Sequence, residues 1–260
     1  MAGPMAIITA CAHEAALVRR RLRVQRQTTG AAGVLWQGTL CSQEVVLLQC
    51  GMGPERAAQA VCWLGQHYAL TGVLSVGFAG GLQAELASGC ALLVTKILAP
   101  YDPPGTTGGA ADVSLRPNAR LAQIAAMAVA QAAVVSHTGA LLSIPTVVAQ
   151  AVAKRDLGQR SGALAVDMES YSIGQAAAQC HLPFAVLRTI FDTADENIAI
   201  PLTTCLTPDG FLQPWHLLGG LVCHPGLWLQ LPHWWRASYL AGSHLQRWLQ
   251  HFFLLLSHGA

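Results

Sequence analysis

The sequence predicts an α/β fold in which helices flank a mixed, mainly parallel β-sheet, followed by a helical C-terminal extension. Short apolar runs alternate with segments of helical periodicity up to about residue 200, which is typical of a sheet covered on both faces. Apolar residues make up 53% of the chain and charged residues only 11%, so we expect a large buried core. Beyond that point Trp, His and Pro become frequent. We therefore predict two parts, residues 1–200 and residues 201–260.

Each predicted element follows from its own pattern. Apolar runs too short for a helix predict buried strands, and in chain order they lie at residues 6–10, 45–49, 72–76, 91–98, 163–166 and 184–190. Apolar residues at helical spacing predict helices between these strands, at residues 14–23, 55–64, 121–134 and 171–180. Pro54 suits the first turn of the second helix. Residues 100–111 are rich in Pro, Gly and Thr and predict a loop, while the tail predicts short amphipathic helices.

Charge and cysteine usage exclude several classes of protein. The net charge of +2 and the lack of a basic stripe exclude a nucleic-acid partner. None of the eight cysteines forms a C-x-x-C pair or has His at zinc-ligand spacing, so we expect free thiols, no metal and no cofactor. The apolar residues 1–12 lack a preceding basic region and predict a strand rather than a signal peptide. We expect a soluble cytoplasmic protein, with peripheral membrane contact through the tail left open.

Acidic side chains gather at or just beyond the predicted strand ends, although charged residues are scarce. In open α/β sheets the ligand crevice lies at the carboxyl ends of the strands. Cleavage of a glycosidic bond needs an acid for the leaving group and a base for water. The alternative for each carboxylate is a helix cap, with Asp167 and Asp195 the foremost candidates. The five carboxylates are Glu14, Asp167, Glu169, Asp192 and Asp195.

Two glycine-rich segments follow predicted strands. Residues 77–81 let the backbone approach a ligand closely, although a purely structural turn explains them equally well. Residues 51–53 precede a helix and suit an anion or a ribose hydroxyl. Neither segment has the spacing of a Walker loop or of the dinucleotide fingerprint.

Four segments carry a resemblance to a known family. The residues Ala165-Val166-Asp167-Met168-Glu169-Ser170 resemble the A-V-[ED]-M-E signature of the nucleoside phosphorylase and methylthioadenosine/S-adenosylhomocysteine nucleosidase family. Residues 188–195 are similar to its R-x-[IV]-[SL]-D-x-A-D segment, residues 76–82 to its G-[ST]-A-G-G-L loop, and residues 7–14 to its first strand. The resemblance spans about residues 5–200 and implies a nucleoside phosphorylase-like fold, a small-molecule nucleoside as partner and a homo-oligomer.

The resemblance also implies roles for individual residues. Asp192 would be the general acid at N7 of the departing purine, and Glu14 would activate the attacking water. Met168 would pack against the ribose while Glu169 binds its 2′- and 3′-hydroxyls. The residues along the base would be Phe78, Ala79, Gly80, Val147 and Val148. Phe78 stands where the family has a small polar residue, and the two valines stand where it has an aromatic one.

The nucleophile is water or phosphate, and the sequence favours water. Phosphate needs arginines aimed at it, and the candidate phosphate-binding residues are Gly53, Arg56 and Arg188. The arginines of residues 19–26 read instead as a solvated face. Glu14 near the nucleophile would repel phosphate, so phosphorolysis is the alternative. A binding protein without activity is the other alternative, which the presence of both an acid and a base disfavours.

The tail bears on the substrate. Residues 206–210, 223–226 and 231–232 resemble the C-terminal extension of hopanoid-associated members of the family. This implies removal of adenine from adenosylhopane, a lipid-linked nucleoside, to leave ribosylhopane. Aromatic residues of the tail could form an apolar surface for a lipid, whereas the alternatives are a helical cap on the core and a subunit interface. These residues are Trp215, Trp228, Trp234, Trp235, Trp248, Phe252 and Phe253.

Overall fold

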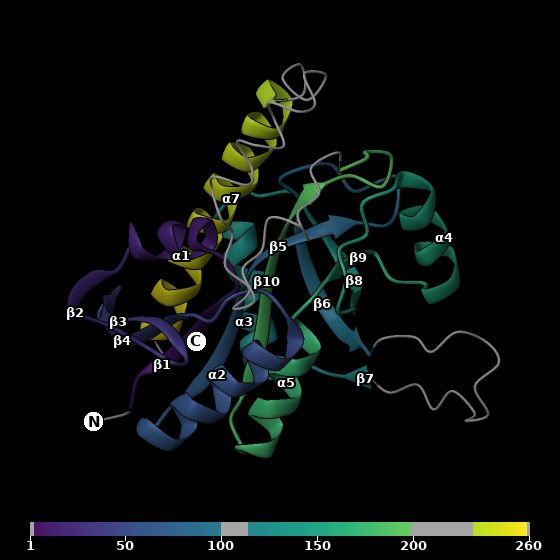
Figure 1. Cartoon of the computed structure of the whole chain (residues 1–260). Helices are drawn as coiled ribbons and strands as arrows, with labels where there is room; N and C mark the ends of the chain where they lie inside the picture. The colour runs from purple at the N-terminus through teal and green to yellow at the C-terminus, as the bar shows by residue number, and fades with distance from the viewer. Residues whose placement is uncertain (1–2, 100–113, 199–230, 259–260) are drawn as a thin grey trace, which may run out of the picture.

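The computed structural model describes residues 3–99, 114–198 and 231–258, which form an α/β arrangement (Figure 1). Its strands are β1 (Met5–Thr9), β2 (Arg23–Gly30), β3 (Gly33–Leu40), β4 (Gln43–Gln49), β5 (Gly72–Gly81), β6 (Ala91–Leu98), β7 (Ser114–Leu115), β8 (Ser136–Ser143), β9 (Ala165–Asp167) and β10 (Phe184–Asp192). Its helices are α1 (Ala12–Arg19), α2 (Pro54–His67), α3 (Ala119–Gln131), α4 (Ala151–Ser161), α5 (Ser170–Gln179) and α7 (Leu231–Ser257). The predicted α/β class, with a mixed sheet, flanking helices and a helical C-terminus, is confirmed.

The described strands form one mixed sheet in the order β10-β6-β8-β9-β5-β1-β4-β3-β2, with β7 beside β6. β5 runs parallel to both β1 and β10. Because β10 also pairs with β6, the strands β5, β9, β8, β6 and β10 close into a ring. The carboxyl ends of β1, β5 and β10 therefore lie at one edge of the sheet, where β9 joins β5.

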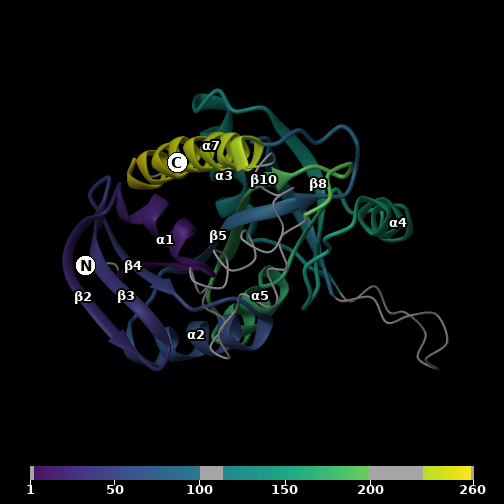
Figure 2. The ribbon, with the colours of Figure 1, turned by 45° about the horizontal axis from the view of Figure 1, so that its top comes forward.

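Helices cover both faces of the sheet (Figure 2). On one face α1, α3 and α7 share a core with Ile7, Leu47 and Leu74. On the other face α2 and α5 share a core with Ala6, Val46 and other residues of the same strands. Successive residues of β1 thus belong to opposite cores, as expected for a parallel strand that is buried on both sides. α4 lies apart from both layers, beside β8 and β9.

Several elements differ from the sequence expectations. β2, β3, β8 and α4 have no predicted counterpart. Two of them, β2 and α4, carry no apolar signal, because every residue of β2 is exposed and α4 buries only Ala151, Lys154 and Gly158. The first helix ends at Arg19, and Arg23 already belongs to β2. β5 continues through Gly81, whereas the pattern predicts an end at Val76.

α7 is one long helix in place of the predicted short ones, over the part of the tail that the structure describes. Its C-terminal half enters the core, where Trp248, Phe252 and Phe253 have no exposed surface. The Trp248 indole donates a hydrogen bond of 2.8 Å to the carbonyl of Ala125 in α3. The prediction that these three aromatic residues form a lipid surface is therefore wrong, and they are instead a cap on the sheet. None of the described helices is long and apolar enough to cross a bilayer.

Other predictions about the tail fall on residues beyond the description. Trp215, Trp228 and the motifs at residues 206–210 and 223–226 lie outside the described residues. Trp234 is half-buried, and Trp235 is exposed at the N-terminal end of α7. The cysteines that the structure describes are free thiols, namely Cys11, Cys41, Cys50, Cys62, Cys90 and Cys180.

We predict that Trp248→Ala lowers the free energy of unfolding by about 3–5 kcal/mol, because it removes a fully buried indole and leaves a cavity between α7 and α3. Urea unfolding followed by circular dichroism measures this change. The control Trp235→Ala, on the same helix but 69% exposed, should stay within about 0.5 kcal/mol of wild type. Equal losses in the two variants would contradict the assignment of α7 to the core.

Candidate active site

A cavity of about 370 Å³ lies where β1, β5, β9 and β10 end. The parallel strands β1, β5 and β10 bring their last residues to the same edge, and the short antiparallel β9 pairs with the last residues of β5, so segments far apart in the chain meet there. The cavity is lined by every residue that the sequence analysis places in catalysis or substrate binding: Glu14, Phe78, Ala79, Gly80, Val147, Val148, Met168, Glu169 and Asp192.

Glu14 is held by three backbone N–H groups. Its Oε2 accepts hydrogen bonds from Ala10 (3.0 Å) and Cys11 (3.1 Å), which cap the start of α1. Its Oε1 accepts a hydrogen bond of 2.9 Å from the backbone N–H of Phe78 in β5. Oε2 of Glu14 thus acts as a helix cap, as the alternative interpretation expects, while Oε1 binds β5 and holds the carboxylate against the cavity wall. A carboxylate with these contacts is fixed in orientation, as a base must be.

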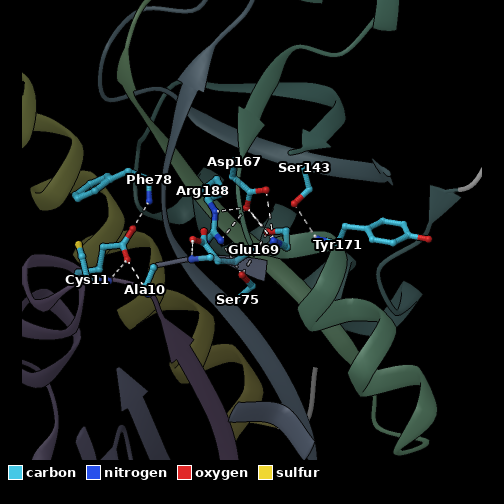
Figure 3. A network of polar contacts seen from close by, with 12 residues as sticks. Ala10, Cys11, Ser75, Phe78, Ser143, Asp167, Glu169, Tyr171 and Arg188 are labelled. Atoms are coloured by element: carbon cyan, nitrogen blue, oxygen red, sulfur yellow. Dashed lines mark hydrogen bonds and ion pairs between the residues drawn. The ribbon is translucent and has the colours of Figure 1, made fainter. Parts of the chain in front are cut away.

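Asp167 and Arg188 form a buried ion pair at the centre of the site (Figure 3). Asp167 Oδ2 accepts a hydrogen bond of 2.9 Å from Nε of Arg188 and lies 2.9 Å from Nη2 of the same guanidinium. Asp167 also accepts a hydrogen bond of 3.3 Å from the backbone N–H of Ser170, the first residue of α5, although the N-cap position of α5 is Glu169 rather than Asp167. Arg188 Nη2 donates a further bond of 2.8 Å to Ser75. The pair therefore joins β9, β10, β5 and the start of α5.

Glu169 lies beside this pair and is buried. Its Oε1 accepts a hydrogen bond of 2.9 Å from the backbone N–H of Gly53. Burial, followed by the nearby charge of Asp167, raises the pKa of Glu169 to about 8, although the Gly53 N–H and Arg188 act in the opposite direction. The carboxyl group of the free protein therefore carries a proton at neutral pH.

A β-bulge positions Asp192. In the pairing of β10 with β5, Ile190 faces Ala79 and Asp192 faces Gly80, so Phe191 is an extra residue. Bulges of this kind re-aim side chains next to active sites. As a result the consecutive residues Phe191 and Asp192 both line the cavity. Burial raises the pKa of Asp192, and a neighbouring ammonium group opposes that rise.

The ammonium group belongs to Lys154 of α4, which the sequence analysis does not identify. Its Nζ forms an ion pair with Oδ2 of Asp192, and Lys154 has no exposed surface. A signal was available, because the chain contains only two lysines, Lys96 and Lys154. Lys154 also shares the buried face of α4 with Ala151 and Gly158, where helical periodicity calls for an apolar residue.

Gly77 explains part of the glycine-rich segment. A Cβ atom at Gly77 would lie 2.2 Å from Oε1 of Glu14 and 3.2 Å from Nη1 of Arg188. The first distance is too short for any side chain, and Glu14 cannot move away without losing its backbone hydrogen bonds. Gly77 is therefore required by the close approach of Glu14 rather than by a turn, since it lies within a continuous strand.

The candidate phosphate-binding residues lie outside the lining of the cavity. The N–H of Gly53 is bonded to Glu169, and the guanidinium of Arg188 is paired with Asp167 and Ser75. The Nε of Arg56 donates a hydrogen bond of 2.8 Å to the carbonyl of Cys50. These three residues thus have partners within the protein, and a phosphate site at Gly53, Arg56 and Arg188 stays a prediction.

Asp195 also departs from its predicted role. It lies in a turn after β10, and its carboxylate forms an exposed ion pair of 2.6 Å with Arg155. The predicted helix cap at Asp195 is therefore wrong. The residue lies outside the lining of the cavity.

The rest of the cavity wall is mostly apolar, and α7 takes part in it. The ring of Phe78 packs against His13 and Phe191, with centroid distances of 5.6 and 5.8 Å. The hydroxyl of Ser238 in α7 lies 3.0 Å from Nε2 of His13. Phe78 and Cys11 lie on one side of the polar network, and Tyr171 points away on the other (Figure 3). Lining residues that the sequence analysis does not name as site residues include Cys11, His13, Met52, Phe191, Ile198 and Ser238.

Comparison with known proteins identifies a family whose model matches this chain. Residues 4–205 match the model of the phosphorylase superfamily. A 5′-methylthioadenosine/S-adenosylhomocysteine nucleosidase from Anoxybacillus flavithermus is 29% identical over 202 residues, which cover 74% of this chain and 87% of that protein.

Solved structures share the fold over nearly the whole chain. A 5′-methylthioadenosine/S-adenosylhomocysteine nucleosidase from Colwellia psychrerythraea, in complex with adenine, has a TM-score of 0.76 at 20% identity and covers 97% of this chain and 95% of its own. The Neisseria meningitidis nucleosidase in complex with methylthio-immucillin-A has a TM-score of 0.75 at 19% identity, with coverages of 97% and 99%. The futalosine hydrolase of Helicobacter pylori has a TM-score of 0.71 at 17% identity, with coverages of 96% and 98%.

We predict that Glu169→Gln makes the protein more stable than wild type in alkaline solution. A carboxyl group whose pKa rises on folding from 4.5 to about 8 stabilises the folded state fully below the lower value and loses that contribution as the pH passes the upper one. The variant has no such proton to lose. Its advantage in urea unfolding should exceed about 1 kcal/mol at alkaline pH and shrink in acid.

The exposed Glu85 offers a matched control for this experiment. Glu85→Gln removes the same charge without a buried environment, so its stability relative to wild type should not change with pH. If the gap between Glu169→Gln and wild type were the same in acid and in alkali, the raised pKa of Glu169 would be disproved.

Proposed function

The chain belongs to the phosphorylase superfamily, and from this premise we propose that it is an N-ribosyl hydrolase that releases adenine from a 5′-modified adenine nucleoside. The observation that carries the proposal is the convergence of Glu14, Glu169 and Asp192 on one cavity. Binding alone does not require an acid and a base in fixed orientations. Nucleosidases among the relatives, one of them solved with adenine, support the same reaction.

The acid and the base act on opposite ends of the bond. Asp192 gives its proton to N7 of the purine, the bond between C1′ and N9 breaks, and its electron pair leaves with the base. Water adds its oxygen to C1′ and gives a proton to Glu14. The products are adenine and the 5′-modified ribose. The burial that raises the pKa of Asp192 favours its role as proton donor.

The contacts of Glu14 and Arg188 favour water over phosphate. Among the described residues, Nη1 of Arg188 has no hydrogen-bond partner. Arg188 lies outside the cavity lining, whereas Glu14 lines the cavity, so a water molecule there would meet a carboxylate that can accept its proton. A phosphate ion in the cavity would instead face the carboxylate of Glu14, while the guanidinium of Arg188 is already paired with Asp167.

The apolar part of the cavity supports a large apolar 5′ group. Phe78, Phe191 and Met52 offer such a group a dry wall, and Ser238 brings α7 to the same cavity. Close to Ser238 on α7, Trp235 and Tyr239 are exposed and stacked, with ring centroids 5.7 Å apart. Together with the resemblance of the tail to hopanoid-associated proteins, these features support adenosylhopane as the substrate and peripheral contact of α7 with a membrane surface.

The test of the reaction is to incubate the purified protein with 5′-methylthioadenosine and other 5′-substituted adenosines, with and without phosphate. We expect free adenine and the free sugar in both cases. Asp192→Asn should lower kcat/KM on the order of 10²–10⁴-fold, because the leaving base loses its proton donor. The control Asp195→Asn, an exposed aspartate three residues on, should retain wild-type activity.

Each alternative gives a different result in this assay. Formation of the sugar 1-phosphate only when phosphate is present would establish phosphorolysis. Binding of the nucleosides without release of adenine from any of them would establish a binding protein. Full activity of Asp192→Asn would remove Asp192 from the reaction.

A series of adenosines with 5′-alkyl groups of increasing length tests the substrate. Because each buried methylene contributes about 0.8 kcal/mol, kcat/KM should rise roughly fourfold per methylene until the apolar wall is covered. Steady-state kinetics of adenine release measures the trend. A maximum at the methylthio group, followed by a steady decline, would instead identify a methylthioadenosine nucleosidase.

A further inference from the structure

Lys154 is a buried charged residue to which the reaction above assigns no task. It has no exposed surface and extends from α4 toward the end of β10. Its ammonium group donates to Oδ2 of Asp192, to the carbonyl of Thr193 (3.0 Å) and to the carbonyl of Glu196 (2.8 Å). An ammonium group has three N–H donors, and each has an acceptor here. Such a group is fully committed and cannot act on a substrate directly.

The contact with Asp192 involves one oxygen only. Oδ2 is bonded to Lys154, whereas none of the three hydrogen bonds of the ammonium group goes to Oδ1. We propose that Lys154 is the positioning residue of Asp192, which holds Oδ2 and thereby presents Oδ1 to the purine. This inference rests on the proposed function of Asp192 and adds the residue that fixes its orientation.

The other bonds of Lys154 connect Asp192 to the part of the cavity wall that we propose lies along the purine. Thr193 and Glu196 belong to the segment after β10, which is bonded to the region of α4 at two further points. The side chain of Asn197 accepts a hydrogen bond of 2.8 Å from the N–H of Ala151, and Ile198 donates one of 2.8 Å to the carbonyl of Ala149. Val147 and Val148, which line the cavity, directly precede this region. Through these bonds Lys154 fixes the position of Asp192 relative to Val147 and Val148.

Lys154 also acts on Asp192 electrostatically. The charged groups that face Asp192 are Lys154 from α4, which lowers its pKa, and Glu196 from the following segment, which raises it. His233 of α7 pairs with Glu196 and not with Asp192. Loss of the ammonium group would remove the largest influence that lowers the pKa of Asp192, so that pKa would rise further. A lysine that only filled space, without its charge beside Asp192, would leave that pKa where it is.

Lys154→Met tests both effects in the full-length enzyme. Because Asp192 donates a proton, activity falls as the pH rises through its pKa, which gives the alkaline limb of kcat/KM. In Lys154→Met this limb should move to higher pH by about 1–3 units, since an adjacent cation lowers a carboxyl pKa by that much. The maximal kcat should fall about tenfold or more, because Asp192 is free to turn. Lys154→Arg, which keeps the charge, should restore the wild-type limb.

The neighbouring Arg155 provides a matched control. Arg155→Met removes a cation of the same helix, but one that pairs with Asp195 on the surface, so the limb and kcat should stay at their wild-type values. A limb in Lys154→Met that coincides with that of wild type would overturn the proposal, even if kcat were reduced.

Stability supplies a readout that needs neither activity nor a folded Lys154 variant. Asp192→Asn leaves the buried ammonium group without its counter-ion, which is destabilising. Its urea midpoint should therefore lie below that of wild type near neutral pH. An Asp192→Asn midpoint equal to that of wild type near neutral pH would show that the pair is not formed. Because adenine release by wild type is measured separately, failure of the proposed function and failure of this inference give different results.

Discussion

The ion pair between Arg188 and Asp167 is the interaction on which the site depends. Glu14, Asp167 and Glu169 lie together in a buried region, where charges without partners cost several kcal/mol each. One guanidinium cannot neutralise three carboxylates, so each of the three acids is accommodated by a different interaction. Arg188 pairs with Asp167, backbone N–H groups hold Glu14, and Glu169 has a pKa raised to about 8. Chemically similar side chains thus have different partners within one buried region, and burial raises the pKa of one of them, Glu169.

The backbone of β5 makes this arrangement sterically feasible. Gly77 leaves room for the carboxylate of Glu14, and the next residue, Phe78, donates its N–H to that same carboxylate. Gly80 faces Asp192 across the bulge in β10. One strand therefore positions Glu14 through a hydrogen bond and Asp192 through the register of the sheet. Rigid strands hold such groups more accurately than loops do.

α7 connects the core of the protein with the mouth of the site. Its C-terminal half is anchored by Trp248 against α3, while Ser238, nearer its N-terminus, lies at the cavity and contacts His13. Thr189 of β10 also bonds to the carbonyl of Ala241, midway along the helix. The helix that completes the cavity wall is therefore held by the same packing that stabilises the fold, and its exposed aromatic residues are a separate surface at one end.

The sequence by itself determined the α/β class and the set of acids around the cavity. Alternating apolar and helical patterns are local, and Glu14 and Asp192 follow β1 and β10, which both run parallel to β5 and end at one edge. Glu169 follows β9, which runs antiparallel to β5, so its place came from the resemblance of residues 165–170 to the family signature. The tertiary structure alone decided the partners of these acids. Lys154 meets Asp192 across 38 residues of the chain, and Asp167 pairs with the guanidinium of Arg188 across 21. Likewise Trp248 looks the same in sequence whether it meets a lipid or α3, because burial depends on packing between distant segments rather than on neighbours along the chain.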